Sequence, residues 1–215
     1  MRDQWYGDNR DLLKWASLVT LARRHKVQAI IQIAMFRPNE PKWQRGTRGF
    51  PAEVLDHFRK LENVHALGLA TGVEILVCKE PFCNRDRPAG TQDAVRAAYF
   101  REARLKLRGF QGKKIIAFLD PDTGLAPQKP EPKHVKESEL KTIYEALKPG
   151  DWLALYQHAP RVKRADAWVT ARRRKFARFL DLSTSPAKRV KTFCALQVAG
   201  DVVLYAVQKA GRRTR

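Results

Sequence analysis

The sequence is short of acidic residues and of long apolar runs. Its 215 residues hold 22 Asp and Glu against 42 Lys and Arg, for a formal net charge of +20. This imbalance is unlike that of an ordinary enzyme of small metabolites and favours a polyanionic partner. No apolar run approaches the roughly 20 residues of a membrane-spanning helix, so we expect nucleic acid rather than a membrane as that partner.

Cysteine is also scarce. Cys78, Cys83 and Cys194 are odd in number and widely placed, which argues against a disulfide framework and suits a reducing compartment. Cys78 and Cys83 have the spacing of half a zinc site, but no second pair or spaced histidines complete it. The N-terminal stretch MRDQWYGDNRD is too polar and acidic for a signal peptide, so we expect a cytoplasmic protein.

Helical and strand patterns alternate along the chain. Periodicity, caps and turn residues predict helices at about 9–25, 52–61, 91–108, 136–147 and 168–180, and strands at 27–36, 63–69, 73–78, 113–120, 152–158, 190–198 and 201–209. We expect one α/β domain over residues 1–209. It would be a Rossmann-like three-layer sandwich with a mostly parallel sheet and a C-terminal antiparallel β-hairpin. Residues 210–215 are expected to form a basic, disordered tail.

Ligands in such sheets bind beyond the carboxyl ends of the strands. The tips to inspect are therefore Phe36–Arg37, Asp120–Asp122 and Gln157–His158. Asp122-Thr123-Gly124 is equally typical of a turn, with a glycine at positive φ. His158 is suited to act as a base or ligand, or simply to satisfy a local hydrogen bond.

Two motifs carry a family resemblance. Asp120-Pro121 at a strand tip resembles the Asp/Asn-Pro-Pro-aromatic motif of class I S-adenosylmethionine-dependent methyltransferases. The N-terminus resembles, at equal spacing, the Gly-x-x-x-Asp-x-Leu-Lys-His stretch of the bacterial enzymes that methylate an adenine N6 in 23S ribosomal RNA, through Gly7, Asp11, Leu13, Lys14 and Trp15. The chain is also similar to a group of bacterial proteins that share GD-x-RDLLK and FLDPDTG, to which we attach no activity.

The resemblance implies S-adenosylmethionine as cofactor and methyl transfer to a base in structured RNA. Lys14 and Asp120 would then surround the methionine end of the cofactor and the target amine, where an acidic oxygen accepts a hydrogen bond from the amine and orients its lone pair. The predicted reactive residues are Asp120, Pro121, Asp122 and His158. The predicted cofactor-binding residues are Gly7, Asp8, Asp11, Lys14 and Phe36.

The sequence departs from this family at two places. No glycine follows the strand at 27–36 until Gly46, where the family has a glycine-rich acidic loop. The second proline and the aromatic residue of the strand-tip motif are replaced by Asp122 and Thr123.

Two other functions remain open on the same residues. Four carboxylates are suited to bind Mg²⁺ and activate water against a phosphodiester, as in a metal-dependent nuclease: Asp8, Asp11, Asp120 and Asp122. The third alternative is a non-catalytic RNA-binding protein that has kept the fold and lost the pocket.

The segment from Arg161 to Lys191 carries eleven basic residues against two acidic ones. It contains the candidate phosphate-binding residues Arg172, Arg173, Arg174, Lys175, Arg178, Lys188 and Arg189. A merely solvated helix usually carries glutamates for i,i+4 pairing, and these are absent, so we expect this segment to bind a polyanion. The family resemblance implies that this polyanion is a nucleic acid, RNA rather than DNA. Trp43, between Lys42 and Arg45, either stacks on a base or pins its loop to the core.

Overall fold

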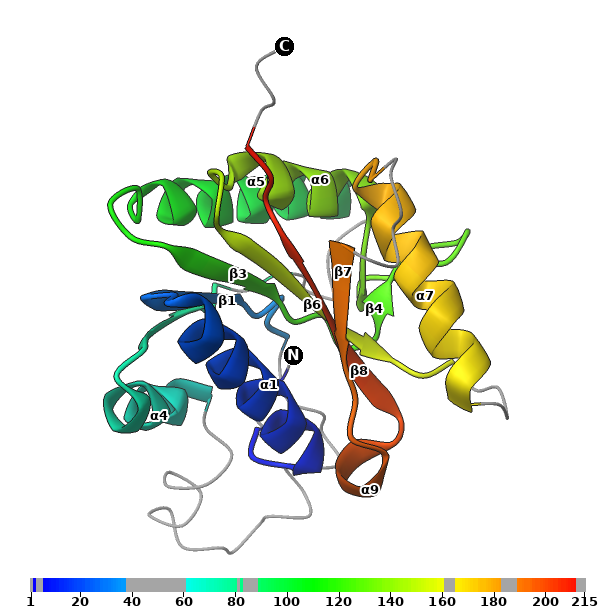
Figure 1. Ribbon diagram of the computed structural model, residues 1–215. Coiled ribbons are helices and arrows are strands. Elements are labelled where there is room, and N and C mark those ends of the chain that lie inside the picture. Colours follow the sequence, from blue (N-terminus) through cyan, green and yellow to red (C-terminus); the bar gives the residue numbers. More distant parts are fainter. Residues whose placement is uncertain are drawn as a thin grey trace, which may run out of the picture.

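The computed structural model describes residues 2, 6–37, 61–80, 82, 89–160, 165–182 and 189–211. Six strands form one sheet in the order β2-β1-β3-β6-β8-β7, with helices over both faces (Figure 1). The strands are β1 (Ala29–Ile33), β2 (Glu74–Cys78), β3 (Ile115–Leu119), β6 (Trp152–His158), β7 (Val190–Phe193) and β8 (Val202–Gln208). The first four pair in parallel, and β8 is antiparallel to β6 and β7. The predicted α/β class, with antiparallel strands at the C-terminal end, is confirmed.

The helices divide into two layers (Figure 1). One face of the sheet packs against α1 (Asn9–His25), α4 (Val64–Thr71) and the short α9 (Leu196–Ala199). The other face packs against α5 (Ala89–Arg108), α6 (Glu137–Ala146) and α7 (Ala165–Phe179). A small parallel pair, β4 (Gly124–Leu125) and β5 (His134–Val135), lies beyond the end of β3. No described helix is long and apolar enough to cross a bilayer.

Strand alternation decides which side chains reach the α1 layer. In β3, Ile116 and Phe118 belong to the apolar cluster under α1, whereas Ile115, Ala117 and Leu119 face α5–α7. Because successive side chains of a strand point to opposite faces, the next residue, Asp120, points toward α1. The same period places Gln32 of β1, and Tyr156 and His158 of β6, on that face.

The strand order reverses between β1 and β3. The chain leaves β1 for β2 on one side and later returns to pair β3 with the other side of β1. The tips of these two strands are held together, since the Asp120 N–H donates to the Ile33 carbonyl at 3.0 Å. Doubly wound sheets bind ligands at such a reversal.

The predicted strand at 63–69 is wrong. These residues form the end of a 3₁₀ turn (Leu61–Asn63) and most of α4, which ends at Gly72 with a φ of 69°. The physical reason is the crossover: parallel β1 and β2 cannot be joined by a hairpin and need an intervening element, usually a helix. Val64 and Gly68, four residues apart, make the buried face of α4, and that spacing fits a helix as well as a strand.

The C-terminal hairpin is shorter than predicted. β7 ends at Phe193, and residues 196–199 form α9, whose Ala199 is buried in the cluster under α1. Two helices also begin earlier than predicted, α5 at Ala89 rather than after Thr91 and α7 at Ala165. The predicted helix at 52–61, the loop with Trp43 and most of the basic tail lie outside the described residues.

Gly124 supports the turn reading of residues 122–124. Its φ is 108°, and an added Cβ would lie 2.4 Å from Oε1 of Gln157. The Gln157 amide ties this turn to β6, accepting from the Leu125 N–H at 2.9 Å and donating to the Thr123 carbonyl at 2.9 Å. Only glycine fits here without moving the turn.

We therefore predict that Gly124→Ala lowers the free energy of unfolding by about 1–3 kcal/mol from backbone strain, with displacement of Gln157 adding to the loss. Urea unfolding followed by circular dichroism measures it. The matched control is Gly112→Ala, where no atom lies within 4 Å of the added Cβ and a change within about 0.5 kcal/mol is expected. Equal effects of the two substitutions would contradict the assignment.

Candidate functional site

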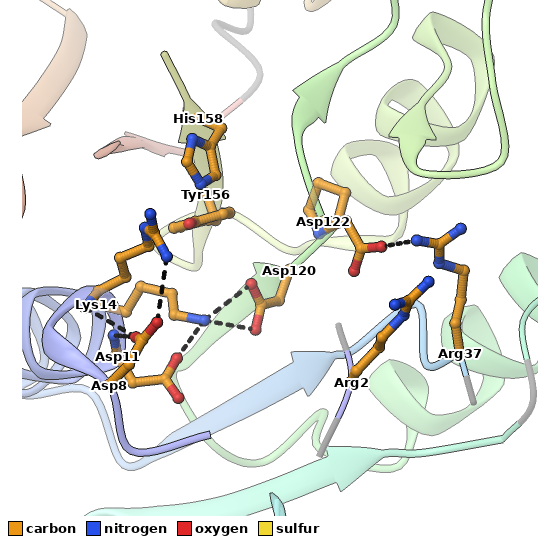
Figure 2. Close-up of a pocket in the computed structure, with 11 residues that line it drawn as sticks. Arg2, Asp8, Asp11, Lys14, Arg37, Asp120, Asp122, Tyr156 and His158 are labelled. Carbon is orange, nitrogen blue, oxygen red and sulfur yellow. Dashed lines mark hydrogen bonds and ion pairs between the residues drawn. The ribbon is translucent and has the colours of Figure 1, made fainter. Parts of the chain in front are cut away.

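A cavity of about 210 Å³ lies where the tips of β1, β3 and β6 meet the start of α1. Figure 2 shows that its side chains come from the N-terminal segment, α1 and these three tips. The lining residues are Arg2, Asp8, Arg10, Asp11, Lys14, Arg37, Asp120, Pro121, Asp122, Tyr156 and His158. Sequence reasoning anticipated Asp8, Asp11, Lys14, Asp120, Pro121, Asp122 and His158.

Lys14 lies at the centre of one side of this cavity (Figure 2). Its Nζ is 2.5 Å from Asp11 Oδ1 and 3.1 Å from Asp120 Oδ2. All three side chains are at least 95% buried. The ammonium also lies 4.7 Å from the centre of the Tyr156 ring, a cation–π distance. A buried ammonium thus joins α1 to the tip of β3, 106 residues away in sequence.

The N-terminus of α1 is built to present these groups. Asp8 caps the helix by accepting hydrogen bonds from the N–H groups of Arg10 and Asp11. Gly7 has a φ of 87° and donates its N–H to Asp11 Oδ2 at 2.7 Å, which fixes that carboxylate. Asp11 and Lys14 are three residues apart and so lie on the same face of the helix.

Asp120 is held from behind by Gln32. The Gln32 Nε2 donates to Asp120 Oδ2 at 2.7 Å, and both side chains are fully buried. Gln32 Oε1 has no hydrogen-bond partner among the described residues. The Asp120 carboxylate is therefore directed at Lys14 and Gln32. The turn that follows it is held by the Gln157 amide instead.

Charge on this side of the cavity is one unit negative. Opposite charges on Asp11 and Asp120 outweigh burial and raise the pKa of Lys14 above its usual value, so it stays an ammonium. Burial, with the nearby Asp120 charge, raises the pKa of Asp11, although Lys14 opposes the shift. One ammonium between two carboxylates leaves an excess negative charge that favours a cationic ligand group.

The other side of the cavity carries the opposite excess. Arg37, at the end of β1, reaches across to form an ion pair with Asp122, and Arg2 lies beside them (Figure 2). Burial alone would raise the pKa of Asp122, but the surrounding cations, including Arg37 and Arg2, lower it. Two guanidinium groups against one carboxylate favour an anionic ligand group here. The cavity is thus dipolar rather than uniformly positive.

Tyr156 and His158 close the cavity from β6. Burial lowers the pKa of His158, although Asp201 opposes this, so the imidazole is neutral near pH 7. Its Nδ1 is 3.7 Å from Asp201 Oδ2, and Arg10 donates two hydrogen bonds to that same carboxylate. Burial also raises the pKa of Tyr156, which keeps its hydroxyl protonated.

Two predicted cofactor residues do not line the cavity. Phe36 packs near Ala34 and Leu61, and the Lys79 ammonium lies 5.0 Å from its ring centre. Gly7 acts through its backbone bond to Asp11. Trp43 and Lys188 lie outside the described residues.

Arg37 was identified from the sequence only as part of a strand tip to inspect. Sequence reasoning missed Arg2, Arg10 and Tyr156 as lining residues, and Gln32 behind them. The sequence contained a feature from which two of these residues could have been identified. Tyr156 precedes His158 by two positions and so shares its face, and Gln32 is a lone polar residue within a buried apolar strand.

The four carboxylates proposed as magnesium ligands do not form a joint cluster. Lys14 Nζ lies between Asp11 and Asp120, Asp8 caps α1, and Asp122 pairs with Arg37. No group of three or more His, Cys, Asp or Glu side chains that could hold a metal is found in the described part of the chain. The Lys14 ammonium thus lies between two of these carboxylates, where the proposal would place a magnesium ion.

α7 carries its basic residues as predicted, with Phe176 and Phe179 buried against the sheet. Among the side chains that the structure describes, none of its five cations forms an ion pair with a carboxylate: Arg172, Arg173, Arg174, Lys175 and Arg178. Among the described side chains of α7, no carboxylate balances this positive charge, which is unlike a merely solvated face.

Sequence comparisons place the chain in no family, since no protein-family model and no curated protein matches it. The cavity at the tips of β1, β3 and β6 and the charge on α7 are therefore the basis for a functional assignment.

The buried Lys14 pairing predicts a strong energetic coupling. Lys14→Met leaves two buried carboxylates without their counter-ion and should lower the free energy of unfolding by about 3–5 kcal/mol. Adding Asp120→Asn should cost much less than the sum of the two single changes, as urea unfolding of all four proteins would show. The control is Lys113→Met, which breaks a surface pair with Glu74 and should cost under about 1 kcal/mol. Additive single effects would contradict the pairing.

Proposed function

We propose that this protein transfers a methyl group from S-adenosylmethionine to an exocyclic amine of a base in RNA, at the cavity around Asp120. The observation that carries the proposal is the Lys14 ammonium bound to Asp120 at the strand-order reversal of the sheet. Residues from the two motifs that resemble RNA adenine methyltransferases, far apart in sequence, meet there. The antiparallel β8, placed between β6 and β7, supports the same resemblance.

The charges of the cavity suit the methionine end of that cofactor, which carries an ammonium, a sulfonium and a carboxylate. Asp11 and Asp120 would face the cationic groups, and Arg2 and Arg37 the carboxylate. The described volume of about 210 Å³ is below the roughly 300–1,000 Å³ of complete small-molecule pockets. The cavity would therefore hold only the methionine end and the target amine, and no described residue is assigned to the adenosine.

When bound, S-adenosylmethionine supplies an electrophilic methyl group. The Asp120 carboxylate accepts a hydrogen bond from the target amine and directs the nitrogen lone pair toward that methyl, while Lys14 and Gln32 fix the carboxylate. The N–C bond would form as the sulfonium C–S bond breaks to leave a neutral thioether, and the amine would lose one proton. His158, neutral near pH 7 and lining the same cavity, is the residue placed to accept that proton.

The other two readings receive less support from this geometry. A magnesium-dependent nuclease needs several carboxylates free to share an ion, and here Lys14 lies between two of them. A purely adhesive protein could use the Lys14 ammonium to hold α1 on the sheet, but this role leaves the two oppositely charged sides of the cavity unexplained. Both readings give distinct results in the test below.

The test measures transfer of labelled methyl groups from S-adenosylmethionine to structured RNA. Wild-type protein should label RNA, and Asp120→Asn should reduce the rate by about 10²–10³-fold through loss of electrostatic positioning. RNA affinity, measured by fluorescence anisotropy, should stay within about twofold because Asp120 contacts no phosphate. Glu74→Gln, which changes an exposed carboxylate that pairs with Lys113 and does not line the cavity, is the matched control and should keep full activity.

Calorimetry separates the alternatives. Absence of heat with millimolar S-adenosylmethionine would overturn the proposal. RNA cleavage with Mg²⁺ or Mn²⁺ that Asp120→Asn abolishes would favour the nuclease instead. RNA binding with neither activity would leave the adhesive role.

A further inference from the structure

A second, larger concavity lies between α6, α7 and the segment that follows β4. This α6–α7 groove has a volume of about 720 Å³. Its floor includes Ala126 and Phe179, and its walls carry Pro127, Gln128, Pro130, Lys136, Glu137, Ser138, Lys141, Lys175 and Arg178. None of these residues belongs to the cavity around Asp120.

Four cations line the groove against one carboxylate, Glu137. Lys136 pairs with Asp93, and Lys141 pairs with Glu137 and Asp181. These two ammonium groups are therefore balanced.

The two cations from α7 differ, since neither pairs with a carboxylate among the residues that the structure describes. Lys175 Nζ donates to the Ala126 carbonyl, which leaves two of its N–H groups for a ligand. Both cations lie near the Phe179 ring, at 5.1 Å for Lys175 and 5.9 Å for Arg178. Burial, together with Arg172 and Arg178, lowers the pKa of Lys175. The Glu137 carboxylate opposes this shift but pairs with Lys141, so burial and the neighbouring arginines outweigh it.

We propose that the α6–α7 groove binds phosphodiester groups of the single-stranded RNA next to the target base, with Lys175 and Arg178 as the phosphate contacts. This inference rests on the nucleic-acid part of the proposed function and is independent of methyl transfer. Proteins that bind single strands commonly follow the backbone with a positively charged groove. Lysine and arginine supply the charge-assisted hydrogen bonds that phosphate oxygens accept.

The position of the groove agrees with a target base in the cavity. Asp122 lines the cavity and Ala126 lines the groove. Three residues lie between them, so their Cα atoms are at most about 14 Å apart. A base that enters the cavity must leave its stack, and this costs least in a single-stranded segment, where the flanking nucleotides are also unpaired. The groove therefore lies within reach of the phosphates that flank such a base.

The test measures the salt dependence of binding to a fluorescein-labelled single-stranded oligoribonucleotide, from 50 to 300 mM KCl. Neutralising both cations, Lys175→Gln with Arg178→Gln, should reduce the slope of log K against log salt by about 1.4, at about 0.7 for each phosphate contact. If wild type and variant bind equally at 1 M salt, this difference in slope makes the variant bind roughly 25-fold more weakly than wild type at 0.1 M salt. The deoxy oligonucleotide of the same sequence should lose a similar slope, because phosphate is the group recognised.

The matched control neutralises two exposed cations at the C-terminal end of α1, Arg24→Gln with Lys26→Gln. It should leave the slope within about 0.3 of wild type. If the Lys175 variant unfolds, Arg178→Gln alone should remove about 0.7, since Arg178 is exposed. An unchanged slope in either groove variant overturns the inference.

The salt dependence of RNA binding can be measured independently of whether the protein transfers methyl groups. The binding assay contains no S-adenosylmethionine, and Asp120→Asn should keep the wild-type slope. A protein that binds RNA through the groove and transfers no methyl group would lose the proposed activity and keep this site.

Discussion

The buried ammonium of Lys14 is the interaction on which this structure depends. It neutralises one of two carboxylates that the fold removes from water, and it ties the first helix to the strand tip at the centre of the sheet. Without the Lys14 ammonium, the buried carboxylates of Asp11 and Asp120 would face each other without a counter-ion, which is strongly unfavourable. The geometry of the cavity therefore depends on this one cation, whereas the apolar face of α1 also packs on the sheet.

The two charged sides of the cavity follow from where the chain enters and leaves the sheet. α1 supplies the Asp11–Lys14 pair, whereas the turn after β1 supplies Arg37, which reaches Asp122 beyond β3. A ligand between them meets negative excess on one side and positive excess on the other. Such an arrangement discriminates in favour of a zwitterion by orientation as well as by affinity.

Much of this could be predicted from the sequence, because local patterns decide it. The buried strands, their parallel order and the carboxylates at their tips follow from apolar runs, helical spacing and the period of two. Asp120 could be placed at the carboxyl edge for that reason. Non-local packing decides the rest: residue spacing does not predict that Arg10 binds Asp201, 191 residues later, or that residues 196–199 form a helix against α1. That Lys14 lies near Asp120 was predicted from the resemblance to RNA adenine methyltransferases and not from the spacing of residues.

The most direct test of this account is the protonation of Lys14. Carbon-13 NMR of protein labelled at lysine Cε follows each ammonium as the pH is raised from 8 to 11, with Lys14→Met identifying the resonance. Surface lysines should titrate near pH 10.4, whereas Lys14 should stay protonated throughout, because Asp11 and Asp120 raise its pKa more than burial lowers it. A Lys14 signal that titrates at or below the pH of the surface lysines would contradict the carboxylate clamp and the site built on it.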